Sequence, residues 1–107
     1  MTDGVYTIDE IKSMIANVVS EYEVEKVYLF GSYARQEATL KSDIDLYIPT
    51  LPEAMGLKYY GMLERLKEVT GKDIDIITDD SVFSTPEYKM KLFAEINSDK
   101  VLVYSLN

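Results

Sequence analysis

The 107-residue chain contains no cysteine and no histidine. The absence of cysteine excludes disulfides, thiolate zinc sites and cysteine nucleophiles. The absence of histidine removes the side chain that most often serves as a general base or as a metal ligand. Any catalysis must therefore depend on carboxylates, on bound metal ions and on cationic side chains.

Long apolar runs are missing as well. No segment approaches the roughly 20 consecutive apolar residues of a transmembrane helix, and the sequence has no signal-peptide pattern. We therefore expect one cytoplasmic domain over residues 1–107, without membrane contact. The formal net charge of −8 argues against binding of long nucleic acid through a basic surface. A protein or a small molecule fits the charge better as a partner.

The most informative segment begins where an apolar run ends at Phe30. Gly31-Ser32 follows, and ten residues later comes Asp43-x-Asp45. A glycine at a strand end lets backbone approach a phosphate closely. A helix that starts at Ser32 would direct its free N–H groups and the hydroxyl at the same anion. Arg35, one turn further on, would add charge-assisted bonds, so Gly31, Ser32 and Arg35 are candidate phosphate-binding residues.

Asp43 and Asp45 predict a metal site. Because side chains alternate along a strand, the two carboxylates share one face at a separation of about 7 Å, while Ile44 and Leu46 face a core. Such a pair can converge on one or two metal ions. Hard oxygen ligands suit Mg²⁺ or Mn²⁺, which complete their shells with phosphate oxygens. Together with Gly31-Ser32, the pattern indicates a site that binds a metal–nucleoside triphosphate.

The segment resembles the signature of the DNA polymerase β-type nucleotidyltransferase superfamily, and it is most similar to the minimal nucleotidyltransferases. The matching positions are Gly31, Ser32, Ala34, Arg35, Glu37 and residues 42–46. One position departs, because Gln36 stands where those proteins usually carry glycine. A glycine would free the turn after the short helix, whereas Gln36 predicts that this helix continues. The resemblance implies an α/β fold in which helices pack a small mixed β-sheet.

The resemblance also implies a third carboxylate on a later strand. Asp75, followed by two apolar residues, matches best, and Asp73 is the alternative. The predicted catalytic and metal-binding set is therefore Asp43, Asp45 and Asp75. Three clustered carboxylates repel one another unless a metal or protons compensate, which favours a functional reason for the cluster.

The rest of the chain alternates predicted helices and strands, which is typical of an α/β sandwich. Thr7 and Glu10 form a capping-box pattern, and a staple between Tyr6 and Ile11 is expected beside it. The expected helices cover residues 8 to about 22, a short turn from Ser32, residues 53–69 with Gly71 as its end, and a last helix from Pro86 capped by Ser84 or Thr85. The expected strands cover residues 25–30, 43–48 and 73–78, with 101–104 as an edge strand.

Two predicted helices carry apolar stripes. The expected core-facing residues are Met55, Tyr59, Met62, Leu66 and Val69 on the 53–69 helix, and Tyr88, Leu92, Phe93 and Ile96 on the last helix. Leu57 lies opposite the first stripe, with Tyr60 toward its flank. These two residues are either scattered exposed apolar side chains, which are common, or part of a partner surface.

The resemblance implies transfer of AMP from ATP with Mg²⁺ or Mn²⁺, releasing pyrophosphate. It further implies a HEPN-domain toxin as partner, with the transferase acting as antitoxin by adding AMP to a tyrosine. Two alternatives remain: a non-catalytic subunit that neutralises its partner by association, and a transferase for small molecules. The second fits less well, because small acceptors need a walled pocket and no second domain is apparent. The sequence leaves the base preference and the homo- or hetero-oligomeric state open.

Overall fold

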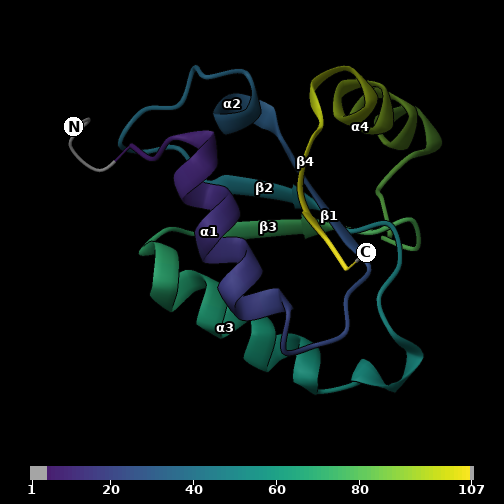
Figure 1. Cartoon of the computed structure of the whole chain (residues 1–107). Coiled ribbons are helices and arrows are strands. Elements are labelled where there is room, and N and C mark those ends of the chain that lie inside the picture. Colours follow the sequence, from purple (N-terminus) through teal and green to yellow (C-terminus); the bar gives the residue numbers. More distant parts are fainter. Residues whose placement is uncertain (1–4, 107) are drawn as a thin grey trace.

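The computed structural model describes residues 5–106. Its elements, in chain order, are α1 (Ile8–Val19), β1 (Lys26–Phe30), α2 (Gly31–Ala34), β2 (Ile44–Tyr47), the 3₁₀ turn η1 (Glu53–Met55), α3 (Lys58–Thr70), β3 (Ile74–Ile77), α4 (Pro86–Asp99) and β4 (Val101–Ser105) (Figure 1). The strand order is β3-β2-β1-β4. β1 runs antiparallel to β2 and β4, whereas β2 and β3 are parallel. The predicted small mixed sheet is confirmed, including the edge position of the last strand.

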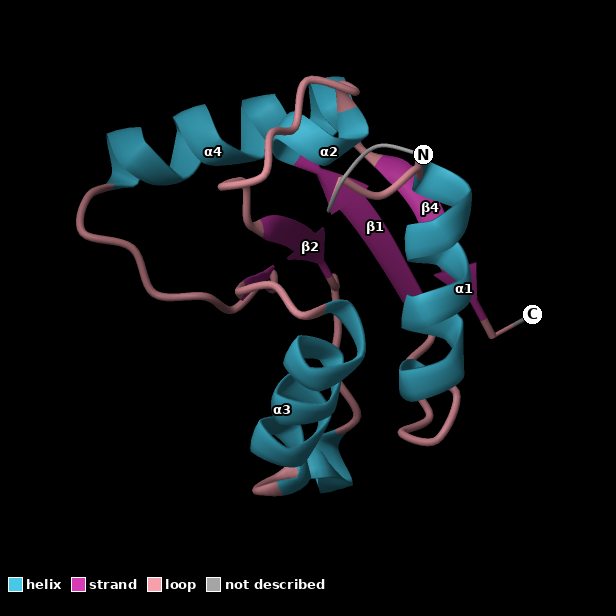
Figure 2. Cartoon of the chain, turned by 90° about the vertical axis from the view of Figure 1, so that its left-hand side faces the viewer, coloured by secondary structure: helices cyan, strands magenta, loops and turns pink. Residues whose placement is uncertain are grey.

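The sheet has one core face and one polar face. Ile44 and Leu46 of β2 are fully buried, and they belong to one apolar cluster with Ile15 of α1 and Leu66 of α3. Asp45, between them on the strand, therefore points to the other face. α4 lies toward that other face and α3 lies on the far side of the sheet from it (Figure 2). The polar face is thus the place where the predicted site residues meet.

The capping box at the start of α1 is confirmed. The Glu10 N–H donates to Thr7 Oγ1 at 3.1 Å, and the Thr7 N–H donates to Glu10 Oε1 at 2.8 Å. The helix ends at Val19 rather than near residue 22. Residues 20–23 form a turn, in which Glu23 has a φ of 58° and leads directly into the buried Val24.

The predicted 53–69 helix is interrupted. Gly56 has φ 49° and ψ −127°, a conformation that residues with a Cβ avoid, so η1 ends at Met55 and α3 begins at Lys58. Gly71 ends α3 in the left-handed region, as expected. The stripe prediction for Val69 is wrong, because its side chain is 42% exposed. Thr70 is buried in its place, four residues after Leu66, and donates its hydroxyl to the Leu66 carbonyl at 2.7 Å.

The last helix packs on the molecule mainly through its C-terminal half. Thr85 is the N-cap and accepts a hydrogen bond from the Tyr88 N–H at 3.0 Å. Ile96 is fully buried, whereas Tyr88 is 54% exposed, so the prediction that Tyr88 faces the core is wrong. The first half of α4 extends past the sheet (Figure 2). Within residues 5–106, no helix is both long and apolar enough to cross a membrane.

Candidate active site

Strand pairing brings two of the predicted carboxylates together. In the parallel register of β2 and β3, Asp45 is paired with Asp75. Asp45 is half-buried, and Asp75 and Asp43 are exposed. Asp73, the alternative third carboxylate, precedes β3 and is not among the charges that act on Asp45. Sequence spacing could suggest Asp75 as a candidate. Its position beside Asp45 depends on the register between two strands that lie 30 residues apart in the sequence.

The backbone at Gly31 lies directly against this pair. In the antiparallel register of β1 and β2, Phe30 is paired with Asp45, so Gly31 begins α2 beside the same carboxylate. Gly31 is buried with a φ of 76°, and a Cβ atom there would lie 2.3 Å from Oδ2 of Asp45. Both the backbone angle and the missing space require glycine. Ser32 follows, half-buried in the first turn of α2.

The electrostatics of the cluster centre on Asp45. Burial, as the largest cause, and the neighbouring charges of Asp75 and Asp43 together raise the pKa of Asp45 from its ordinary value to about 6. A hydrogen bond with Asp75 and the charge of Glu95 on α4 act in the same direction. Because four acidic groups affect one another here, a proton or a cation relieves their repulsion.

The donor set fits a hard divalent cation. Among residues 5–106, no three acidic side chains already converge as a ready metal site. The charges of Asp43 and Asp75 nevertheless act on Asp45, which shows that the three carboxylates are neighbours. Carboxylate oxygens on neighbouring strands are the ligands that Mg²⁺ and Mn²⁺ prefer.

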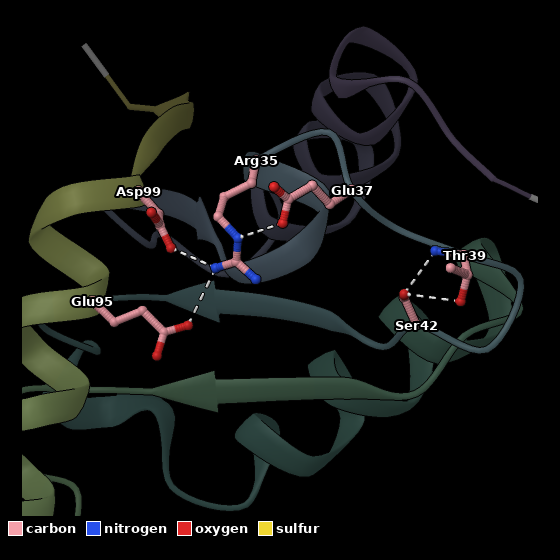
Figure 3. A network of polar contacts seen from close by, with 6 residues as sticks. All are labelled: Arg35, Glu37, Thr39, Ser42, Glu95 and Asp99. Atoms are coloured by element: carbon pink, nitrogen blue, oxygen red, sulfur yellow. Dashed lines mark hydrogen bonds and ion pairs between the residues drawn. The ribbon is translucent and has the colours of Figure 1, made fainter.

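Arg35 is paired with acidic side chains of α4 and of its own turn. Its guanidinium forms ion pairs with Asp99 at 2.7 Å, with Glu37 at 3.1 Å and with Glu95 at 3.3 Å (Figure 3). Hydrogen bonds to Asp99 and Glu37 raise the pKa of Arg35 above its ordinary value. The predicted phosphate ligand thus ties α2 to the C-terminal half of α4. Local sequence reasoning had no signal for contacts that span 60 and 64 residues.

The turn after α2 corrects the prediction for Gln36. The short helix does not continue, because Gln36 has a left-handed φ of 60°. The Gln36 N–H donates to the Tyr33 carbonyl at 3.2 Å, and the Glu37 N–H donates to the Ser32 carbonyl at 2.8 Å. This pair of bonds is a Schellman motif, in which glycine usually occupies the left-handed position. The turn therefore forms with glutamine at a position whose left-handed backbone angle favours glycine.

The loop that leads into β2 is closed by its own polar groups. The Thr39 N–H donates to Ser42 Oγ at 2.8 Å (Figure 3). The Ser42 N–H donates to the Thr39 carbonyl at 3.0 Å. These bonds fix the residue directly before Asp43. Ser42, which matched the motif, acts as a loop constraint in the structure.

Comparisons with known proteins agree with this geometry. A family model described as "Polymerase beta, Nucleotidyltransferase" matches residues 13–107. "Putative protein adenylyltransferase MJ0435" of Methanocaldococcus jannaschii is 36% identical over 80 residues, which cover 70% of this chain and 81% of that protein.

Solved structures share the fold. A toxin–antitoxin crystal structure with AMP-PNP superposes with a TM-score of 0.67 at 16% identity, over 90% of this chain and 74% of that one. A complex of tri-AMPylated HEPN toxin with MNT antitoxin from Shewanella oneidensis superposes with a TM-score of 0.62 at 15% identity, over 92% of this chain and 73% of that one. At these identities the likeness concerns the arrangement of helices and strands.

Proposed function

The chain belongs to the polymerase β-type nucleotidyltransferase family, and on this basis we propose that it transfers AMP from ATP to a hydroxyl of a partner protein. The observation that carries the proposal is the position of Asp45. Its carboxylate lies between the glycine backbone that begins α2 and the paired Asp75. A phosphate bound at the Gly31 backbone would therefore lie next to the carboxylates of Asp45 and Asp75.

Each residue has a proposed role. Gly31 and Ser32 would hold the triphosphate, because backbone and hydroxyl groups at a helix start can donate to an anion there. Asp43, Asp45 and Asp75 would hold Mg²⁺ or Mn²⁺, whose chemistry is to neutralise the phosphates and align the attacking and leaving oxygens. Asp75 is exposed and would take the proton of the acceptor hydroxyl. The hydroxyl oxygen would then bond to the α-phosphorus, and the bond to pyrophosphate would break.

Arg35 would contribute to phosphate binding only after a change of partners. Its guanidinium is held by Glu37, Glu95 and Asp99, so it would have to exchange at least one carboxylate for a phosphate oxygen. Such an exchange keeps the charge of the guanidinium balanced.

The proposed acceptor is a tyrosine of a HEPN-domain toxin, which this chain would neutralise as antitoxin. Two observations support it. The relative from M. jannaschii is described as a "putative protein adenylyltransferase", and the S. oneidensis structure is a complex of a tri-AMPylated HEPN toxin with an MNT antitoxin. The net charge of −8 also fits a protein acceptor better than RNA.

The test combines binding and transfer. Mg²⁺–ATP should raise the thermal midpoint of the chain, because a ligand that binds only the folded state stabilises it. Incubation with a purified cognate HEPN-domain protein should add AMP units to the mass of that protein, on a tyrosine. Asp43→Ala should abolish the mass gain. If millimolar Mg²⁺–ATP leaves the midpoint unchanged and the partner binds without gaining mass, the chain is a non-catalytic binding subunit.

A further inference from the structure

The ion pairs around Arg35 bring together more negative than positive charge. Asp99 and Glu95 accept hydrogen bonds from Nη1 of the guanidinium, and Glu37 accepts one from Nε (Figure 3). No other cation of residues 5–106 forms an ion pair with these carboxylates, and Lys91, one turn before Glu95 on α4, is not paired with it. Three carboxylates therefore share one cation, so Arg35 can release one of them and still have its charge compensated.

The three carboxylates bind Arg35 unequally. Asp99 Oδ2 lies 2.7 Å from Nη1, and the Asp99 side chain is only 12% exposed. Glu37 is 66% exposed but belongs to the same turn as Arg35, and its Oε1 lies 3.1 Å from Nε. Glu95 Oε1 lies 3.3 Å from Nη1, on a side chain that is 48% exposed. Hydrogen bonds to Asp99 and Glu37 raise the pKa of Arg35, whereas Glu95 is not among the causes of this shift. Glu95 thus forms the longest and weakest of the three contacts.

Glu95 is also the partner of Arg35 that belongs to the surroundings of the active-site carboxylates. Among the three partners, only the charge of Glu95 acts on Asp45. Asp45 contacts Gly31, whose backbone would hold the triphosphate. The Arg35 N–H donates to the Gly31 carbonyl at 3.0 Å, so the arginine begins one helical turn after this backbone. Glu95 therefore lies within ion-pair distance of the arginine and within electrostatic range of the proposed metal ligands.

The guanidinium can bind a phosphate without losing its other contacts. Within the part of the chain that the structure describes, Nη2 of Arg35 forms no hydrogen bond. When Glu95 leaves Nη1, the N–H groups of Nη1 and Nη2 can bind one phosphate through two parallel hydrogen bonds, the geometry in which arginine recognises phosphate. Asp99 and Glu37 keep the arginine in place during this exchange.

We propose that Glu95 is a positioning residue of the nucleotide site, which holds Arg35 in the nucleotide-free protein and releases it to a phosphate of ATP. The inference rests on the proposed function and names the carboxylate that gives way when the triphosphate binds. Glu95 thereby competes with the triphosphate for the arginine. Because Glu95 and Asp99 lie one turn apart on α4, nucleotide binding breaks one contact of Arg35 with this helix and keeps the other.

Competition of this kind predicts that loss of the Glu95 charge tightens nucleotide binding. Glu95→Gln keeps the size of the side chain, but its neutral amide binds a guanidinium more weakly than a carboxylate does. The dissociation constant of Mg²⁺–AMP-PNP, a nonhydrolysable analogue of Mg²⁺–ATP, should fall at least about threefold in titration calorimetry, a change in the range that exposed ion pairs contribute. A carboxylate with a purely structural role would give unchanged or weaker binding when removed.

Two further variants separate the exchange from a general effect of charge. Glu37→Gln is the matched control, because it also removes a carboxylate partner of Arg35 but one whose charge does not act on Asp45. It should leave the affinity within about twofold of the wild type, since a distant exposed charge is screened. In an Arg35→Gln background, Glu95→Gln should lose its effect, because the two residues then have no interaction left to break. Binding is measured below the lowest thermal midpoint of the set, so that every variant is folded.

The outcomes distinguish the role of Glu95 from the proposed function. Unchanged or weaker binding of Mg²⁺–AMP-PNP to Glu95→Gln, while the wild type binds, would overturn the role of Glu95 and leave the nucleotide site standing. An equal gain in Glu37→Gln, or a gain that persists without Arg35, would overturn the exchange and assign the effect to general repulsion. If millimolar Mg²⁺–AMP-PNP does not bind the wild type, the proposed nucleotide site is wrong, and the role of Glu95 is wrong with it.

Discussion

Gly31 and Asp45 are in such close contact that a Cβ atom on the glycine would lie 2.3 Å from Oδ2 of the aspartate. The two residues come from the two halves of the sequence motif, Gly31-Ser32 and Asp43-x-Asp45. Their contact makes the two halves one site, because neither can move without displacing the other. The expected consequences can be measured.

Replacement of Gly31 by alanine should combine a clash with backbone strain. We expect Gly31→Ala to lower the free energy of unfolding by at least about 2 kcal/mol and to abolish AMP transfer. Gly71→Ala is the matched control, since Gly71 also has a positive φ of 67° but no atom within 4 Å of its added Cβ. That variant should cost about 1 kcal/mol in urea unfolding and keep its activity. Equal losses in both variants would show that the contact with Asp45 has no energetic effect.

Removal of the Asp45 charge should stabilise the metal-free protein. Its pKa is raised from 3.8 to about 6 in the folded state, so the folded protein binds more protons than the unfolded chain between these values. The wild type should therefore lose stability as the pH rises from about 4 to 6. At pH 7.5 in chelator, Asp45→Asn should be about 1–2 kcal/mol more stable than the wild type, after allowance for partial solvent screening. At pH 3.5 the difference should vanish.

The same variant should transfer AMP at background level. Lower stability of Asp45→Asn at pH 7.5 would mean that the carboxylate has a structural partner, and would count against its role as a metal ligand. Unchanged transfer would refute the proposed mechanism.

Gln36→Gly should stabilise the turn after α2. A left-handed φ of 60° costs a residue with a Cβ more than it costs glycine. After subtraction of the entropy that glycine loses, we expect a gain of about 0.5–1 kcal/mol in the free energy of unfolding. Gln36→Ala separates the two effects, because it removes the side chain but keeps the strain, and it should bring no gain. A similar gain from both substitutions would locate the effect in the side chain.

Arg35→Lys should weaken the attachment of α4 to the turn after α2 and lower the thermal midpoint. A lysine can replace one of the three carboxylate contacts but lacks the fork of donors that reaches Glu37, Glu95 and Asp99 together. The thermal midpoint should fall further than for Arg65→Lys, whose arginine has an ion pair with Glu21. The gap should narrow in 1 M salt, where exposed ion pairs are screened. Equal midpoints for the two variants at low salt would contradict a tethering role.

Most of the helices and strands could be predicted from the sequence, because the patterns that determine them involve residues only a few positions apart. The capping box at Thr7, the alternation around Asp45 and the end of α3 at Gly71 are of this kind. The errors have physical causes that composition does not reveal. The helix predicted over residues 53–69 includes Gly56, whose φ and ψ end the turn η1 before α3 begins. The short helix was predicted to continue because Gln36 replaces the family's usual glycine, whereas the hydrogen bonds of the turn give Gln36 a left-handed backbone angle.

The site was predictable to the same extent. Spacing and resemblance suggested the residues, but the pairing of Asp45 with Asp75 depends on the register of two strands, which a single sequence does not encode locally. The contacts of Arg35 with Glu95 and Asp99 depend on where α4 crosses the fold. Long-range geometry of this kind decides whether the arginine of the motif contacts a ligand or a neighbouring helix.

β3, which carries Asp75, lies at one edge of the sheet, with β2 on one side and no strand of residues 5–106 on the other. Edge strands open at a lower free energy than central strands. Opening of β3 would separate Asp75 from Asp45 while the apolar cluster beneath β2 stays intact. A metal ion held by both Asp45 and Asp75 would therefore stabilise this edge of the sheet against opening. Amide hydrogen exchange in β3 should slow when Mn²⁺ and ATP are added, whereas exchange in β4, at the opposite edge, should stay the same.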